Sequence, residues 1–89
     1  MSKKKKFILN KECFYQDIDN VLFLLHTKTG QYHEINGSGK YIIEILDSNS
    51  LSIDEIIDKI NHSQYKLKRN DIANFIDQLF EREIISIEG

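Results

Sequence analysis

The sequence contains no proline, no tryptophan and only one cysteine, Cys13, among its 89 residues. A single cysteine excludes an internal disulfide and agrees with a reducing compartment. The longest uninterrupted apolar run, residues 21–25, is far shorter than the ~20 residues that a membrane-spanning helix needs. Only three apolar residues follow the lysine-rich start, too few for a signal peptide. We therefore expect a cytoplasmic protein without a membrane partner.

No proline-rich or glycine-serine segment divides the chain, which predicts a single domain. Apolar residues make up 40% of the sequence and include 15 isoleucines, enough to offset the entropy that folding costs. Four consecutive lysines, at residues 3–6, precede the first strand signal. We predict a flexible basic N-terminal tail at residues 1–10 and one domain at residues 11–89.

The charge balance is uneven along the chain. Four of the 12 basic residues are the lysines at positions 3–6, whereas all 14 acidic residues come later. From Phe7 onward the chain therefore has 8 basic and 14 acidic residues, a formal charge of six negative. An acidic body repels the phosphate backbone, so we expect no nucleic acid partner.

The first half of the chain has the pattern of three strands, at residues 13–17, 20–27 and 31–35. A three-residue loop at residues 28–30 would place Leu25 opposite His33. The same pairing places His26 and His33 on opposite faces of the hairpin. The third strand is the most polar, so we expect it at the edge of the sheet, with one row of backbone donors and acceptors unpaired.

The second half changes to helical spacing. A first helix capped by Asn36 or Ser38, a second opened by the capping-box pair Ser52 and Glu55, and a third from Asn70 or Asp71 to about Arg82 are predicted. This order predicts an α+β fold, winged-helix-like, in which a three-stranded antiparallel sheet is followed by three helices.

The predicted third helix carries two apolar stripes. One contains Ile72, Phe75 and Leu79, and the other contains Ala73, Ile76 and Phe80. Periodicity leaves two interpretations open for the second stripe, which either completes the core or lines a groove.

Groups with recognisable chemistry are scarce. Cys13, His26, His33 and His62 lack the paired spacing of zinc ligands. Residues 37–40 (GSGK) lack the spacing of a phosphate-binding loop. No nucleophile is paired with a recognisable base. We therefore expect no enzyme, no metal and no cofactor.

A winged helix could also read DNA. The third predicted helix and its end carry Asp71, Asp77, Glu81 and Glu83 against Arg82 alone. Phosphate repulsion would oppose docking of this helix in a groove of DNA, so the sequence disfavours this use.

The stretch at residues 24–39 (LLHTKTGQYHEINGSG) fits the pattern L-L-x-x-x-x-G-x-Y-x-x-[LI]-N-x-x-G throughout. It resembles the PqqD-like family, the RiPP recognition elements, and within it the small stand-alone leader-binding proteins of lasso-peptide biosynthesis. The resemblance extends from about Cys13 to Ile87. His33 stands where many lasso members have an aromatic residue.

The resemblance implies that the leader of a precursor peptide adds as an antiparallel strand to the third strand and lies in the groove beside the third helix. The backbone of residues 31–35 would pair with the leader, four apolar residues of the helix would hold its side chains, and two polar residues would contact it at the rim. The implied peptide-binding residues are Gln31, Tyr32, His33, Glu34, Ile35, Arg69, Ile72, Ala73, Ile76, Asp77 and Phe80.

The implied partners are the precursor leader peptide and a leader peptidase or other modifying enzyme, which carries out the chemistry while this protein tethers its substrate. An unliganded edge strand could also pair with a second copy of the chain. The alternatives are a PqqD-like peptide chaperone for a radical SAM enzyme and, third, a winged-helix DNA-binding protein.

Overall fold

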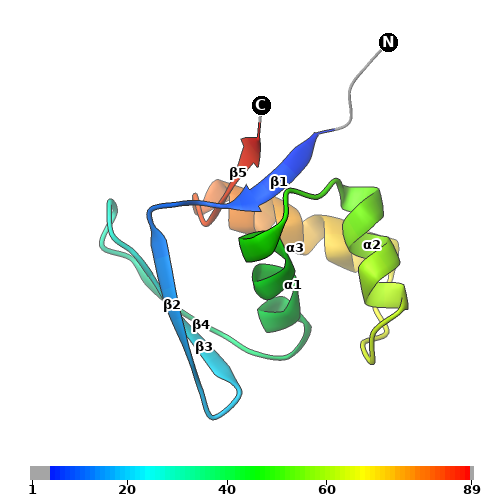
Figure 1. Cartoon of the computed structure of the whole chain (residues 1–89), viewed down its shortest axis with the longest axis horizontal. Helices are drawn as coiled ribbons and strands as arrows, with labels where there is room; N and C mark the ends of the chain where they lie inside the picture. Colours follow the sequence, from blue (N-terminus) through cyan, green and yellow to red (C-terminus); the bar gives the residue numbers. More distant parts are fainter. Residues whose placement is uncertain (1–4, 89) are drawn as a thin grey trace.

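The computed structural model describes residues 5–88 and has an α+β fold (Figure 1). Its elements in chain order are β1 (Lys6–Leu9), β2 (Cys13–Ile18), β3 (Val21–His26), β4 (Tyr32–Ile35), α1 (Gly37–Ser48), α2 (Ile53–Asn61), α3 (Arg69–Glu81) and β5 (Ile85–Glu88). The antiparallel sheet β2-β3-β4 precedes the three helices, which confirms the predicted architecture. A second sheet pairs β1 with β5.

The β2–β3 hairpin closes through a two-residue turn at Asp19 and Asn20, whose φ angles are 52° and 65°. Asp and Asn adopt this left-handed conformation more readily than other residues with a side chain, and two in succession form a turn whose twist matches the strands. β2 therefore pairs with β3 along its whole length, starting from Cys13 opposite His26.

The β3–β4 hairpin has a longer loop than predicted. The His26 N–H donates to the Gln31 carbonyl at 2.9 Å, so pairing begins there, and Leu24 lies opposite His33. The predicted pairing of Leu25 with His33 is therefore wrong by one position. Because a one-residue shift moves each side chain to the other face, His33 shares a face with His26, and the prediction of opposite faces is also wrong.

The prediction of a flexible tail through residue 10 is wrong for β1. Its residues pair with β5 in antiparallel register, with Lys6 opposite Glu88 at the other end of the described chain. Phe7 and Leu9 are 8% and 9% exposed, so β1 contributes side chains to the core. Residues 1–4 of the predicted tail, with Lys3 and Lys4, lie outside the described residues.

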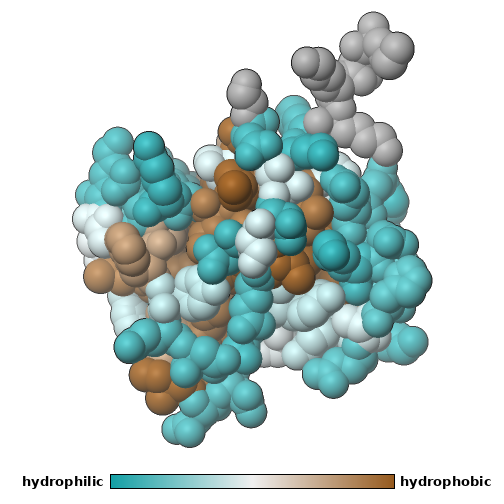
Figure 2. Space-filling view, in the orientation of Figure 1, coloured by the Kyte–Doolittle hydropathy of each residue, from teal (hydrophilic) through white to brown (hydrophobic). Residues whose placement is uncertain are grey.

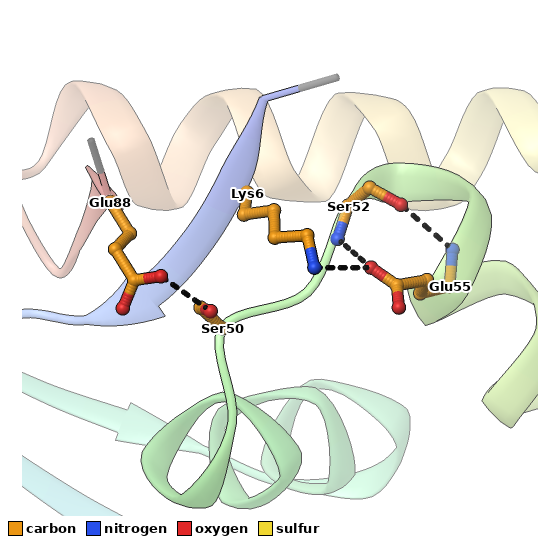
Figure 3. A network of polar contacts seen from close by, with 5 residues as sticks. All are labelled: Lys6, Ser50, Ser52, Glu55 and Glu88. Atoms are coloured by element: carbon orange, nitrogen blue, oxygen red, sulfur yellow. Dashed lines mark hydrogen bonds and ion pairs between the residues drawn. The ribbon is translucent and has the colours of Figure 1, made fainter. Parts of the chain in front are cut away.

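Polar contacts attach this second sheet to the start of α2 (Figure 3). Lys6 Nζ lies 3.9 Å from a carboxylate oxygen of Glu55, and the Ser50 hydroxyl donates to Glu88 at 2.8 Å. The predicted capping box is confirmed, because the Glu55 N–H donates to the Ser52 hydroxyl and the Ser52 N–H donates to the Glu55 carboxylate. These contacts fix the beginning of α2 beside β1.

The core lies between the helices and one face of the three-stranded sheet. Its fully buried side chains include two leucines of β3 and isoleucines from all three helices: Leu22, Leu24, Ile42, Ile43, Ile56, Ile60, Ile72 and Ile76. Ile76 of the second predicted stripe therefore belongs to the core. Among residues 5–88, no helix is long and apolar enough to cross a membrane.

Within residues 5–88, no element covers the opposite face of the sheet. Phe14, Ile18, Leu25 and Tyr32 are exposed there by 47% to 63% of their surface. Figure 2 shows apolar surface over this part of the molecule, toward the left of the view. The sheet thus has one face in the core and one apolar face in solvent.

Candidate functional site

A groove of about 570 Å³ lies between β4 and α3. The whole of β4 forms one side of it, and the start of α1 contributes to its floor. The opposite side consists of Asp71, Phe75, Gln78, Leu79 and Arg82, with Leu67 before the helix. Since these helix residues recur at intervals of three and four, they occupy one face of α3.

β4 is an edge strand, as predicted, because among the described residues it pairs only with β3. The ladder alternates between hydrogen-bonded and non-hydrogen-bonded pairs, and His26 with Gln31 is a hydrogen-bonded pair. Two positions along, the backbone of His33 also faces β3. The N–H and C=O groups of Tyr32 and Glu34 therefore point outward to the open edge.

The predicted site residues are only partly brought together. Four of the five predicted residues around β4 line the groove, whereas the exposed Gln31 precedes the strand and its carbonyl is bonded to β3. The prediction that Ile72 and Ile76 face a groove is wrong, because both are 0% exposed. The remaining predicted residues do not line the groove, namely Ala73, Asp77, Phe80 and Arg69.

Two of these remaining residues have partners elsewhere. Phe80 makes an edge-to-face contact with Phe7 of β1, at 6.4 Å between ring centroids. The Arg69 guanidinium pairs with the Asp54 carboxylate at 2.6 Å. Neither side chain is therefore available to the groove in this arrangement.

Sequence reasoning missed the helix residues that do form the site. Asp71, Gln78 and Arg82 are polar and interrupt the apolar pattern, so a search for apolar stripes passes over them. Phe75 was assigned to the core stripe, yet it is only partly buried and lines the groove. The recurrence of these four residues on one face is the signal that could have identified them.

Gly39 sets how closely three elements approach beneath the groove. A Cβ atom placed there would lie 2.9 Å from Ile35 Cγ2 of β4 and 2.9 Å from Phe75 Cζ of α3. Any larger residue would displace one of these side chains, and both line the groove. Close packing therefore explains why a glycine ends the sequence pattern at residues 24–39.

His33 contributes the imidazole of the groove. Partial burial lowers its pKa, and the positive charge of Arg82 and the nearby His26 lower it further. His26 is 1% exposed and accepts a hydrogen bond at Nδ1 from the Thr29 N–H at 3.3 Å. Within the described residues, the Nε2 atoms of both histidines are buried without a hydrogen-bond partner.

Cys13 is not an activated nucleophile. Its side chain is 6% exposed, and its thiol contacts the Ile84 carbonyl at 3.7 Å. Burial, with a smaller contribution from the Glu12 carboxylate, raises the pKa of the thiol to about 11. A catalytic thiol requires a lowered pKa. Residues 5–88 also contain no cluster of three or more metal-ligating side chains.

Residues 22–85 match the model of the family described as Coenzyme PQQ synthesis protein D (PqqD). The chain belongs to the PqqD family. This match spans β3 to the start of β5, and thus includes both walls of the groove. The resemblance to PqqD-like recognition elements, noted from residues 24–39, is confirmed.

Solved structures similar to this PqqD family member include "TbiB1 in Complex with the TbiA(beta) Leader Peptide", with a TM-score of 0.73 and 26% identity over 92% of this chain and 95% of that chain. Another is "Lasso peptide synthetase B1 complexed with the leader peptide", with a TM-score of 0.72 and 23% identity over 90% and 96% of the two chains. No curated protein matches.

Proposed function

We propose that this PqqD family member binds the leader of a ribosomally made precursor peptide by strand addition to β4 and presents it to a processing enzyme of lasso-peptide biosynthesis. The observation that carries the proposal is the position of the open edge of β4 directly beside the groove. TbiB1, similar over 92% of this chain, is complexed with a leader peptide, which supports the same use here.

Backbone pairing would supply the part of the affinity that is independent of sequence. The outward N–H and C=O groups of Tyr32 and Glu34 are the ones that an added strand can bond. Without a peptide they face water at the open edge. A second copy of the chain could pair at the same edge, and leader binding would then compete with this edge-strand dimer.

Side chains of the groove would supply the selectivity. Alternate residues of an added strand point to the same side, and those on the helix side would meet Phe75, Leu79 and Ile35. Phe75 is the central contact, because it is partly buried and, like Ile35, approaches Gly39 at the floor of the groove. We propose this set in place of the predicted residues of the second stripe.

The mechanism is tethering without catalysis by this chain. Holding the leader raises the effective concentration of the attached core peptide near a leader peptidase or other modifying enzyme. The raised pKa of the Cys13 thiol is compatible with a role in which this thiol is not a nucleophile. The free thiol is also compatible with action in the cytoplasm.

The family description supports a second candidate function. A member of a family described by coenzyme PQQ synthesis could deliver its peptide to a radical SAM enzyme in place of a leader peptidase. Both functions would use the same groove. They are distinguished by which enzyme, a leader peptidase or a radical SAM enzyme, processes its peptide faster when this chain is present.

The test is a titration of this chain into a fluorescein-labelled leader peptide from the precursor gene beside its own gene, followed by fluorescence anisotropy. We expect saturable binding in the micromolar range or tighter. Phe75→Ala should weaken it by about tenfold or more, since truncation of a central aromatic contact costs at least ~1.4 kcal/mol.

Phe80→Ala is the matched control. It removes the same side chain from the same helix, but Phe80 lies outside the groove and contacts Phe7. It should lower the melting temperature and leave leader affinity unchanged. Equal losses of affinity in both folded variants, or no binding by the wild-type chain, would contradict the proposed site.

A further inference from the structure

The two walls of the groove run in opposite directions. Phe75 and Ile35, the last residue of β4, both approach Gly39, since a Cβ atom placed there would lie 2.9 Å from each side chain. The positive charge of Arg82 acts on His33 near the start of β4. α3 therefore runs from the Ile35 end of the groove to the His33 end. The start of the helix lies toward the end of β4, and the end of the helix lies toward the start of β4.

A charged side chain stands at each end of this wall. Asp71 is one helical turn before Phe75, and Arg82 follows two turns after it. Both are exposed and line the groove, and neither has an ion-pair partner among residues 5–88. The other charged residue of the lining, Glu34, directs its side chain to the opposite face of the sheet from His33.

The distance between the two charges matches a short extended peptide. Arg82, the C-cap of α3, is eleven positions after Asp71, which corresponds to about 16 Å along the helix axis. An extended strand advances about 3.3 Å per residue, so it covers this distance in about five residues. The stretch between the charges is mainly apolar on the helix side, with Phe75 and Leu79.

We propose that Asp71 and Arg82 select the charge polarity of the bound leader, an inference that rests on the proposed function. A strand antiparallel to β4 begins at the Ile35 end and finishes at the Tyr32 end. Its N-terminal part therefore passes Asp71 and carries a basic side chain there. An acidic side chain about four or six residues later contacts Arg82, because only an even spacing brings both side chains to the helix side of the strand.

The charges of Asp71 and Arg82 affect which peptide is bound more than they affect how tightly a matching peptide is bound. An exposed ion pair contributes little by itself, whereas a peptide of reversed polarity would place like charges together at both ends. Neighbouring residues carry the opposite signs, with Lys68 before Asp71 and Glu81 and Glu83 beside Arg82, but they do not line the groove. The proposal is thus specific to the two lining residues.

The test uses a display library of random twelve-residue peptides, selected against the full wild-type chain and sequenced. Enriched peptides should carry Lys or Arg about four or six residues before Asp or Glu, an even spacing that keeps both side chains on the helix side. The double variant Asp71→Lys with Arg82→Glu should enrich the reversed order. One synthetic binder of each polarity is then titrated against the wild-type chain and against the double variant. Each peptide should bind the protein that selected it about fivefold or more tightly than it binds the other protein.

The matched control is Asp77→Lys with Lys11→Glu, which makes the same two charge changes at exposed positions outside the groove. It should enrich the same peptides as the wild-type chain. Groove binders that lack a charge order, or an order that the Asp71 and Arg82 exchange does not reverse, would overturn the inference and leave leader binding standing. If the folded chain enriches no peptide at all, both this inference and the proposed function fail.

Discussion

Gly39 is the single residue on which the depth of the groove depends most directly. An alanine there gains about 1 kcal/mol of helix propensity, but overpacking typically costs about 1–3 kcal/mol. The added Cβ would lie 2.9 Å from both Ile35 and Phe75, so the overpacking cost should exceed the gain.

We therefore expect Gly39→Ala to lower the free energy of unfolding by about 1 kcal/mol and leader affinity by about tenfold. Urea denaturation and anisotropy measure the two effects. Ser48→Ala, at the other end of the same helix, is exposed and outside the groove; it is the control and should change affinity much less. A Gly39→Ala variant that binds as tightly as wild type would show that the groove adjusts without loss.

His33 should make the stability of the protein depend on pH. Its folded-state pKa is below the ordinary value of 6.5, first because of burial and then because of Arg82 and His26. The unfolded chain therefore binds the proton more tightly than the folded one. The resulting stabilisation is fully present above about pH 6.5 and is lost as the pH falls through the folded pKa.

The expected outcome is a melting temperature that falls between about pH 8 and about pH 5, and falls less in His33→Gln. The comparison with the variant isolates His33, because every other ionisable group is present in both proteins. Identical pH profiles for the two proteins would mean that protonation of His33 is not coupled to folding.

At the scale of elements, β4 has two kinds of backbone position. Glu34 has its N–H at the open edge, whereas the N–H of His33 faces β3 in the ladder that begins at His26 and Gln31. Proline deletes an N–H without adding charge. We expect Glu34→Pro to fold and to lose leader binding, because an added strand would lack one of its main-chain bonds.

His33→Pro is the companion variant and should damage the sheet itself, because it removes a ladder hydrogen bond to β3 and leaves its acceptor unsatisfied, a loss of about 1–3 kcal/mol. Circular dichroism melts and leader titration separate the two effects. A Glu34→Pro variant that folds and still binds the leader like wild type would mean that the peptide is held by another surface.

At the scale of the whole molecule, the charge distribution opposes DNA binding. The chain from Phe7 onward has a formal charge of six negative, and Asp77 and Glu81 are exposed on α3. We expect no retention of duplex DNA at about 0.15 M salt in an electrophoretic mobility assay.

A variant lacking residues 1–4 identifies the cause of any binding that occurs. If the full chain binds duplex DNA and the shortened chain does not, the binding comes from Lys3 and Lys4, and the rest of the chain does not bind DNA. Micromolar binding of duplex by the shortened chain would contradict the charge argument and favour the winged-helix alternative.

The sequence by itself determined the features that depend on neighbours along the chain. Turn residues and capping signals, such as Ser52 with Glu55, act within a few residues, so the three strands of the larger sheet, the three helices and their order could be predicted. The polar composition of residues 31–35 was also enough to place that strand at the sheet edge.

Only the tertiary structure decided the features that depend on distant partners. β1 exists because β5, at the far end of the chain, supplies its hydrogen bonds. The loop before β4 set the register and moved His33 to the inner face. The rotation of α3 against the sheet buried Ile76 and turned Arg82 into the groove, and a periodic pattern cannot reveal this rotation because every face of a helix has the same period.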